Sequence, residues 1–289
     1  MRVLIAGANG MLGHDLVDVL SHQENIEVFP FIRKELDITD MQMVMKTVNE
    51  VRPDILINAA AYTNVDLCET EIDISYQINA VGSRNLAVAA NEYHTAMLHF
   101  STDYVFPGNA DSPYREFDPI QPKSIYGKSK WAGEELIRSL CPRHYIIRTS
   151  WLYGMHGKNF VSTMLHVASK QSSVRVVNDQ VGSPTYTLDL AHGVAELFTK
   201  HGAYGTYHLS NSGTCSWFDF AKEIFTQRGL DTYVESMTTA ELARPAPRPA
   251  YSVLDNQLWR LSGLTPLRPY QEALADYLKK LQIAEGGIS

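Results

Sequence analysis

The sequence predicts an α/β protein in which a doubly wound parallel sheet is followed by a smaller C-terminal α+β lobe. In the first half of the chain, short continuous apolar runs alternate with longer amphipathic segments, the pattern of parallel strands covered by helices on both faces. After about Trp151 this rhythm loosens. We therefore expect a Rossmann-like domain over residues 1–150 and a lobe over residues 151–289, some segments of which return to the main sheet.

Periodicity and end signals place the elements of the first half. Thr39 or Asp40 can cap the second helix, and Pro53 lies just past its end. We expect strands at 3–6, 26–31, 55–58, 97–101 and 145–148, and helices at 11–21, 41–50, 74–93 and 126–140.

The second half is predicted to contain helices at 159–169, 188–200, 217–228 and 270–281, and a strand at 174–177. Between the last two helices lies Arg244-Pro245-Ala246-Pro247-Arg248-Pro249, a stiff basic loop. A polyproline ligand for a partner remains open as an interpretation, and an ordered loop beside a ligand is favoured. Residues 285–289 are expected to be a frayed tail.

Composition restricts the classes of partner. The chain of 289 residues has a net charge of −7 and no run of Lys or Arg, so no nucleic-acid partner is expected. No secretory signal or membrane span is recognisable, which predicts no membrane association. Cys68, Cys141 and Cys215 lack a CxxC spacing and are typical of reduced thiols in a cytoplasmic protein. The histidines show no metal-ligand spacing, so no catalytic metal is expected.

A glycine-rich turn follows the first predicted strand. Gly7, Gly10 and Gly13 form G-x-x-G-x-x-G at the start of a helix. The first two allow the backbone to turn tightly and approach a pyrophosphate, and the third lets helix and strand pack closely. The first helical N–H groups, at Met11 and Leu12, would face the phosphates. The motif predicts a dinucleotide site, with a purely structural turn as the alternative.

The second predicted strand ends in basic residues where an acid often binds the ribose of NAD. Arg33 and Lys34 would accept a 2′-phosphate, which favours NADPH over NADH, although NADH remains a possible substitute and both charges can be solvated loop residues. Asp37 and Ile38 could then lie against the adenine. Small residues after the third strand, Ala59-Ala60-Ala61, would let the backbone lie along the cofactor.

Three residues provide the chemistry for moving a proton to or from a carbonyl. Tyr126 and Lys130 are four apart on a predicted helix and so share one face. An ammonium nearby lowers the pKa of a phenol, which makes Tyr126 a usable acid or base. Lys130 could also hold the nicotinamide ribose. Thr102, at the end of the fourth strand, could donate a hydrogen bond to the same substrate oxygen.

Asp103 has two open interpretations, an acid catalyst and a turn or capping residue. A dehydratase needs an acid and a base in addition to the hydride chemistry, and here a tyrosine, Tyr104, follows the aspartate. The single carboxylate weighs against dehydration.

Several motifs carry a resemblance that covers nearly the whole chain. The chain resembles the extended short-chain dehydrogenase/reductase superfamily, and within it the dTDP-4-dehydrorhamnose reductase family. The segments that match are 60–66 (AAYTNVD), 101–108 (STDYVFPG), 126–134 (YGKSKWAGE), 148–154 (RTSWLYG) and 178–185 (NDQVGSPT).

This resemblance implies the last step of dTDP-L-rhamnose synthesis. Hydride from NADPH would reach C4 of dTDP-4-dehydro-L-rhamnose, Tyr126 would protonate the new alkoxide, and Thr102 would polarise the carbonyl. Lys130 would tune Tyr126 and bind the ribose. The resemblance also implies a sugar and nucleotide site made by Thr102, Asp103, Tyr104, Tyr126, Trp151, Asp179, Gln180, Arg248 and Ser252.

Further implications concern assembly and rival functions. A homodimer is implied by resemblance alone, and no bridging metal is expected.

One rival function is that of a nucleotide-sugar epimerase or dehydratase, which keeps its cofactor through the cycle. The other is a non-catalytic reductase-like regulatory subunit, against which the intact Thr102, Tyr126 and Lys130 weigh.

Overall fold

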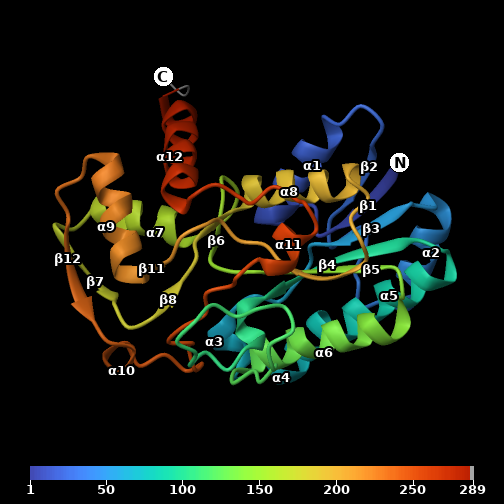
Figure 1. Cartoon of the computed structure of the whole chain (residues 1–289), viewed down its shortest axis with the longest axis horizontal. Coiled ribbons are helices and arrows are strands. Elements are labelled where there is room, and N and C mark those ends of the chain that lie inside the picture. Colours follow the sequence, from blue (N-terminus) through green and yellow to red (C-terminus); the bar gives the residue numbers. More distant parts are fainter. Residues whose placement is uncertain (287–289) are drawn as a thin grey trace.

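The computed structural model describes residues 1–286 and is organised around a six-stranded parallel sheet in the order β10-β5-β4-β3-β1-β2 (Figure 1). The predicted α/β fold with a doubly wound sheet is confirmed. The strands are β1 (Arg2–Ala6), β2 (Glu27–Phe31), β3 (Ile55–Asn58), β4 (Ala96–Thr102), β5 (His144–Thr149) and β10 (Gly205–His208).

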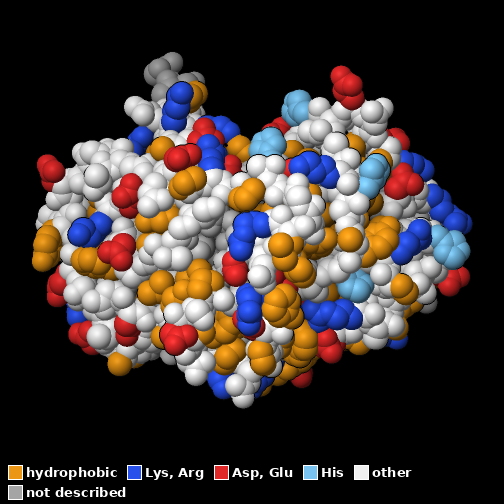
Figure 2. Space-filling model, in the orientation of Figure 1, with side chains coloured by type: hydrophobic (Ala, Val, Ile, Leu, Met, Phe, Trp, Pro, Cys, Tyr) orange, Lys and Arg blue, Asp and Glu red, His pale blue; other side chains and the backbone are white. Residues whose placement is uncertain are grey.

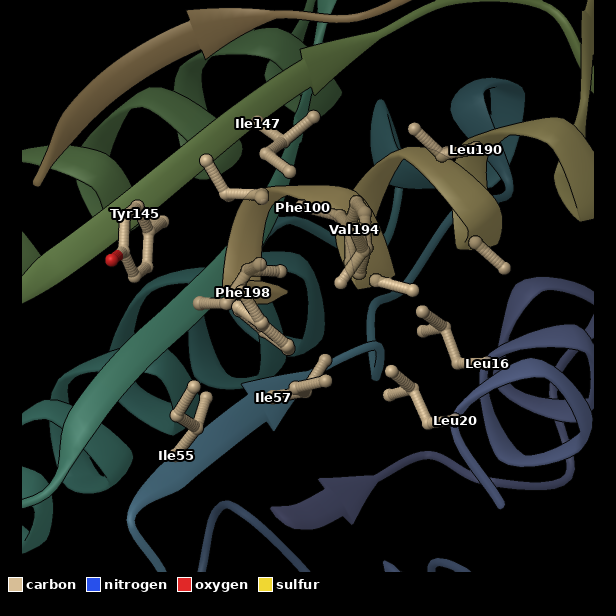
Figure 3. Close-up of a cluster of buried hydrophobic side chains, with 14 of the residues drawn as sticks. Leu16, Leu20, Ile55, Ile57, Phe100, Tyr145, Ile147, Leu190, Val194 and Phe198 are labelled. Carbon is tan, nitrogen blue, oxygen red and sulfur yellow. The ribbon is translucent and has the colours of Figure 1, made fainter. Parts of the chain in front are cut away.

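Helices cover both faces of this sheet because successive strand residues point to opposite sides. Val3 and Ile5 pack with α1 (Met11–Ser21) and α8 (Thr187–Thr199), whereas Leu4 packs on the other face with α2 (Met41–Val51), α5 (Ser83–Glu92) and α6 (Ile125–Leu140). Figure 3 shows the first of these clusters, in which Leu16 and Leu20 of α1 and Leu190, Val194 and Phe198 of α8 pack with Ile55, Ile57, Phe100, Tyr145 and Ile147 of the strands.

The strand order reverses at β1, which pairs with β2 on one side and β3 on the other. The connections after β1 and β3 therefore lie side by side at the carboxyl edge of the sheet, where open α/β sheets bind ligands. Ala59 N–H donates to the Ala6 carbonyl at 3.0 Å, which joins the two connections directly.

The helix predicted over 74–93 is interrupted. The structure has α4 (Ile72–Tyr76), a π-helical segment η1 (Gln77–Gly82) and then α5. Inside η1, the Asn79 amide donates to the Tyr62 carbonyl and to Ser129 Oγ, and its oxygen accepts from Tyr62 N–H. We attribute the wider turn to these contacts, which periodicity could not indicate, and short π segments frequently occur at functional sites.

The remaining elements form the smaller lobe, but α8 and β10 return to the main sheet. The lobe has an aromatic core that includes Tyr153, Tyr186, Phe220 and Tyr277. Its elements are β6 (Leu152–Tyr153), α7 (Phe160–Ala168), β7 (Ser173–Val177), β8 (Val181–Gly182), β9 (Thr185–Tyr186), β11 (Cys215–Ser216), α9 (Trp217–Arg228), β12 (Tyr233–Met237), α10 (Thr239–Leu242) and α12 (Tyr270–Gly286). Helix α11 (Gln257–Leu261) instead packs on the main sheet, where Trp259 contacts Tyr207 of β10.

Only part of the predicted tail over 285–289 lies within the described residues. Helix α12 continues to Gly286, and the rest of the predicted tail, 287–289, lies outside the described residues. Among residues 1–286, no helix is long and apolar enough to cross a membrane. Acidic and basic side chains are interspersed on the face shown in Figure 2.

Candidate active site

At the glycine turn, the backbone packs directly against other backbone atoms. Gly7 has φ of +84°, and a Cβ there would come within 2.7 Å of Ala60 N. A Cβ on Gly13 would come within 2.2 Å of the Gly7 carbonyl oxygen. Gly10 is less confined, since its Cβ would lie 3.3 Å from the same oxygen. The turn therefore leaves peptide groups, rather than side chains, to face a ligand.

The first turn of α1 is open to an anion. Gly10 occupies the N-cap position, no side chain caps the helix, and no acidic residue lies in its first turn. Leu12 is buried in the core, so it can offer a ligand only its backbone N–H. Met11 packs near Gly154. Free N–H groups and the positive end of the helix dipole suit a pyrophosphate.

A cavity of about 230 Å³ extends from this turn over the ends of β1 to β3. It contains most of the cofactor residues that we predicted. Arg33 is largely exposed at its rim, and its Nε lies 3.6 Å from the Asp37 carboxylate. Lining residues are Gly7, Asn9, Gly10, Arg33, Leu36, Asp37, Ile38, Thr39, Ala59, Ala60, Ala61, Tyr62 and Ile78.

Local hydrogen bonds hold the Asp37–Ile38 segment. The Asp37 carboxylate accepts from Thr39 N–H at 2.9 Å and Thr39 Oγ1 at 2.8 Å. Burial opposes ionisation of Asp37, but the Thr39 hydrogen bonds and the nearby Arg33 outweigh it and lower the pKa. The Asn85 amide donates to the Ile38 carbonyl at 3.0 Å. The segment thus presents a fixed carboxylate beside an exposed guanidinium.

Helix α6 begins against the end of β4. Its N-cap Ser124 accepts from Gly127 N–H at 3.1 Å, and a Cβ on Gly127 would come within 2.3 Å of the Tyr104 carbonyl oxygen. Thr102 closes β4 and caps the short 3₁₀ helix η2 (Asp103–Val105) by accepting from Tyr104 N–H at 3.2 Å. The predicted catalytic residues Thr102, Tyr126 and Lys130 therefore meet where α6 and β4 pack together.

The environment of Tyr126 favours the protonated form of its phenol. Burial raises its pKa far above the ordinary value, although the Thr102 hydroxyl opposes the rise. The lowering that we expected from Lys130 is not seen. Instead, the Lys130 side chain reaches β4, where its Nζ lies 2.6 Å from the Phe100 carbonyl oxygen and 3.1 Å from His99 Nε2.

The pKa of Lys130 is also shifted. Its side chain is 2% exposed, and burial lowers its pKa to about 8, against the opposing effect of Glu134. A lysine in this state can change protonation close to neutral pH.

Asp103 is a buried carboxyl group, 2% exposed, that accepts from Thr102 Oγ1 at 2.9 Å. Burial raises its pKa to about 6, although the hydroxyls of Ser252 and Thr102 oppose the rise. Of the two interpretations left open, capping of η2 falls to Thr102 rather than Asp103. Ser252, predicted to hold the nucleotide, is buried near this carboxyl group, and within residues 1–286 neither Ser252 Oγ nor Asp103 Oδ2 has a hydrogen-bond partner.

A second cavity, of about 400 Å³, lies on the lobe side of Tyr126. Tyr104 lines it and packs edge-on against the Tyr126 ring, with centroids 5.5 Å apart. Arg248 donates to Tyr104 Oη at 3.0 Å and to Asp66 Oδ1 at 2.8 Å. The cavity is lined by Asp66, Tyr104, Phe160, Thr163, Met164, Arg175, Val176, Val177, Gln180, Trp217, Met237, Leu242, Arg244 and Arg248.

Only some of the predicted substrate residues line this cavity. Tyr104, Gln180 and Arg248 do. Trp151 instead stacks on Trp217 at 3.5 Å, and Trp217 is the ring that faces the cavity. Asp179 accepts from Thr239 N–H and Oγ1, which fixes the start of α10. Trp151 and Asp179 thus support residues beside the cavity in this structure, and their contact with the substrate stays a prediction.

Asp66, Phe160 and Trp217 were missed in the sequence. Asp66 lies in α3 (Val65–Cys68), far along the chain from Arg248. An aromatic cluster at the start of α9 was the available signal for Trp217, and the matching segment 60–66, which ends at Asp66, was the available signal for Asp66. Within residues 1–286, no group of three His, Cys, Asp or Glu side chains is placed to hold a metal ion, and the three cysteines are free and buried.

Comparisons with known proteins identify the family of this chain. The chain is 47% identical over 279 residues to the spore coat polysaccharide biosynthesis protein SpsK of Bacillus subtilis, covering 96% of this chain and 97% of that protein. A solved dTDP-4-dehydrorhamnose reductase from Clostridium acetobutylicum is 46% identical, with a TM-score of 0.95 and coverage of 98% and 100%.

A second solved dTDP-4-dehydrorhamnose reductase, from Bacillus anthracis and in complex with NADP, is 43% identical, with a TM-score of 0.94 and coverage of 96% and 99%. Residues 1–283 match the family described as RmlD substrate binding domain. The resemblance is thereby confirmed, and this chain belongs to the RmlD substrate binding domain family, that of the dTDP-4-dehydrorhamnose reductases.

Proposed function

We propose that this protein reduces the C4 keto group of dTDP-4-dehydro-L-rhamnose to dTDP-L-rhamnose with NADPH, the final step of dTDP-rhamnose synthesis. The observation that carries the proposal is the position of α6 between the two cavities. Tyr126 packs on Tyr104 of the second cavity, and Ser129 is joined through Asn79 to Tyr62 of the first.

The first cavity fits a dinucleotide. Gly7 lets the turn lie directly against the Ala59–Ala60 backbone, the α1 N-terminus is uncapped, and the exposed Arg33 can reach a 2′-phosphate. Asp37, Ile38 and Ala59–Ala61 would hold the adenosine half. When bound, NADPH supplies the hydride. NADH would lose the Arg33 contact, so we expect it to be a poorer donor.

Tyr126 is the proton donor in this proposal. Because its phenol is protonated at neutral pH, it can give a proton to the alkoxide as the carbonyl accepts a hydride. Thr102 Oγ1, within reach of the same phenol, orients the substrate oxygen. Tyr104 and Trp217 offer aromatic faces to the deoxysugar, and Arg248 offers a charged fork to the diphosphate.

The two rivals make different predictions. A dehydratase would need a second acid beside Asp103, but Tyr104 stands there and its hydroxyl is held by Arg248. An epimerase or dehydratase keeps its cofactor, whereas a reductase releases it at each turnover. Protein purified free of nicotinamide supports the reductase. A regulatory subunit would retain its full function in Tyr126→Phe.

The proposal includes the division of labour between the two parts of the chain. Residues 1–150 hold the dinucleotide, and residues 151–289 mainly hold the substrate.

We place the enzyme in the cytoplasm, supported by its three unpaired, buried thiols. Homodimerisation stays a prediction, which light scattering on the purified protein can check.

The test is NADPH oxidation with enzymatically prepared dTDP-4-dehydro-L-rhamnose, followed by loss of NADPH absorbance and by identification of the sugar product, with NADH run in parallel. We expect rapid oxidation and formation of dTDP-L-rhamnose. If folded protein binds NADPH but does not oxidise it, the proposed substrate is wrong, and other dTDP-keto-sugars are tested next.

A further inference from the structure

The proline-rich loop, residues 244–249, follows α10 and borders the second cavity. Its Arg244 and Arg248 line that cavity, and the side chain of Ala246 is buried. The prolines at alternate positions fix their own φ and keep each preceding residue in an extended backbone. The loop therefore loses little conformational entropy when it is held in one place, and few contacts suffice to hold it there.

Other contacts fix the chain on either side of this loop. Before it, Thr239 at the start of α10 donates its N–H to Asp179 at 2.9 Å. After it, Tyr251 N–H donates to the Gly108 carbonyl at 3.0 Å. Between these two attachments, residues 244–248 contact α3.

The contact with α3 is made by one carboxylate, that of Asp66. Its Oδ1 accepts from Arg248 Nη2 at 2.8 Å and from Ala246 N–H at 3.3 Å. Its Oδ2 lies 3.6 Å from Arg244 Nη1. Because proline has no N–H, Ala246 has the one backbone donor between the two arginines. Three alternate residues of the loop thus converge on Asp66.

Asp66 also sets the orientation of Arg248. One terminal nitrogen, Nη2, donates to Asp66, and the other, Nη1, donates to Tyr104 Oη at 3.0 Å. A guanidinium has five N–H groups, so three stay available for a ligand in the cavity. Because both terminal nitrogens are engaged, these three have fixed directions. Tyr104, held by the same arginine, lies edge-on to the Tyr126 ring.

The charge of Asp66 alone would have the opposite effect on an anionic ligand. A carboxylate repels a diphosphate, and Asp66 offsets one of the two loop arginines. The third arginine that lines the cavity, Arg175, is paired with Glu241 at 2.9 Å and with Glu235 at 3.4 Å. If net charge decided binding, removal of Asp66 would strengthen it. If the orientation of Arg248 decides binding, removal of Asp66 weakens it.

We propose that Asp66 is a positioning residue that holds the proline-rich loop beside the second cavity and orients Arg248 toward the diphosphate of a nucleotide-sugar. The identity of this ligand rests on the proposed function, whereas the attachment of the loop to α3 does not. A ligand then meets an arginine whose direction is already set, which lowers the entropy cost of binding.

The attachment can be measured without a ligand. Within residues 244–249 only Arg244, Ala246 and Arg248 have backbone N–H groups, so hydrogen–deuterium exchange of this loop reports on three sites. In full-length Asp66→Ala, exchange at Ala246 should become at least about tenfold faster, because its acceptor is gone. Unchanged exchange in the loop of the folded variant overturns the proposal.

Peptides from β4 and α6 serve as the folding control, since they should keep their wild-type exchange. Asp66→Asn, which keeps the shape of the side chain and a neutral acceptor, serves if Asp66→Ala fails to fold. Its expected increase in exchange at Ala246 is smaller, about threefold.

The orientation of Arg248 is tested with dTDP, which carries the diphosphate, by calorimetric titration. Asp66→Ala should weaken dTDP binding about fivefold and Asp66→Asn about threefold, because the loss of a charged partner leaves Arg248 mobile. In turnover, the same factor should appear in KM for the keto-sugar, while kcat stays within about twofold. Affinity for dTDP in Asp66→Ala that equals or exceeds that of the wild type overturns the proposal.

Glu235→Gln is the matched control for charge. It removes an exposed acid that is paired with an arginine of the same cavity, but it leaves the contacts of Asp66 intact. Its affinity for dTDP should equal or slightly exceed that of the wild type. A loss as large as that in Asp66→Ala would show that the effect is not specific to the loop, which contradicts the proposal.

A double variant shows whether Asp66 acts through Arg248. Arg248→Ala should weaken dTDP binding about tenfold, and adding Asp66→Ala should weaken it less than about twofold further. If the two losses instead multiply to about fiftyfold, Asp66 acts independently of Arg248 and the positioning role is wrong.

The outcomes separate this proposal from the proposed function. If loop exchange and dTDP binding respond as expected but the wild-type protein does not reduce the keto-sugar, the proposed reaction fails while the role of Asp66 stands. If the wild-type protein reduces the keto-sugar, and folded Asp66→Ala exchanges and binds dTDP like the wild type, the role of Asp66 is wrong and the reaction stands.

Discussion

The two cavities beside α6 are constructed in opposite ways. The cofactor cavity lies over connections that follow neighbouring strands of one sheet, and its lining includes Gly7, Gly10 and residues 59–61, whose side chains are absent or a single methyl group. The second cavity is made of side chains from α3, η2, α7, β7, α9 and the proline-rich loop. Its central ion pair, between Asp66 and Arg248, joins residues 182 positions apart.

This difference shows what each site demands of the chain. A backbone site needs glycine where a Cβ would collide, and it tolerates variation elsewhere. A site made of side chains depends on charges and rings that only tertiary packing brings together. Substitutions should therefore act through shape in the first cavity and through individual contacts in the second.

The largest effect on turnover is expected from substitution of Tyr126, which lies between the two cavities. Tyr126→Phe keeps the ring but removes the proton donor, so kcat should fall by about 100-fold or more. The Kd for NADPH, measured by fluorescence titration, should change less than about twofold. Turnover close to that of the wild type would remove Tyr126 from the mechanism.

Gly7→Ala tests whether the first cavity depends on backbone shape. A left-handed φ costs about 1–2 kcal/mol for a residue with Cβ, and here the Cβ would also meet Ala60 N at 2.7 Å. We expect NADPH affinity to fall at least about tenfold, with lower stability. The control is Gly229→Ala, where φ is +68° and no atom lies within 4 Å. Equal NADPH affinity in both variants would contradict the backbone account.

Asp103→Asn tests the buried carboxyl group at the junction. The pKa of Asp103 is raised to about 6 from 3.8, so its ionisation lowers stability as pH rises through 6. The variant should be more stable than wild type at pH 7.5 by about 1–2 kcal/mol. The gain should shrink as pH falls through 6 and disappear by about pH 3, below the ordinary value of 3.8, where the carboxyl group is neutral in the folded and the unfolded protein alike. Denaturant unfolding at both pH values checks this sign.

Arg248→Ala removes one contact from the second cavity. Hydrogen bonds to charged groups contribute about 1.5–3 kcal/mol when buried, and less at a half-open site. We expect KM for the keto-sugar to rise about tenfold, while kcat and NADPH affinity change little. A fall in NADPH affinity of the same size would show that the two cavities are not independent.

The smallest effect is expected at Arg33, which is exposed. Arg33→Ala should reduce the preference for NADPH over NADH by about fivefold, since a screened surface contact with a phosphate contributes about 1 kcal/mol. The ratio of kcat/KM values for the two cofactors measures it. Lys34→Ala, which lies outside the cavity lining, is the control.

Much of the site follows from local sequence signals. The glycine spacing after β1 located the dinucleotide cavity, and the four-residue separation of Tyr126 and Lys130 placed them on one face of α6. The protonation of Tyr126 and Lys130 was harder to predict from the sequence. Lys130 was expected to act on Tyr126, but burial dominates both groups, and His99 becomes a neighbour only when β4 and α6 pack together.

By itself, then, the sequence determined the features that depend on neighbours within one or two turns of chain: strand and helix periodicity, the glycine turn, and the order of the catalytic residues. Tertiary structure decided the π-helical segment at Asn79, the return of β10 to the sheet, and the meeting of Asp66 with Arg248. It also decided the protonation of Lys130. The physical reason is that desolvation and hydrogen-bond partners are properties of packed neighbours, and those neighbours come from distant parts of the chain.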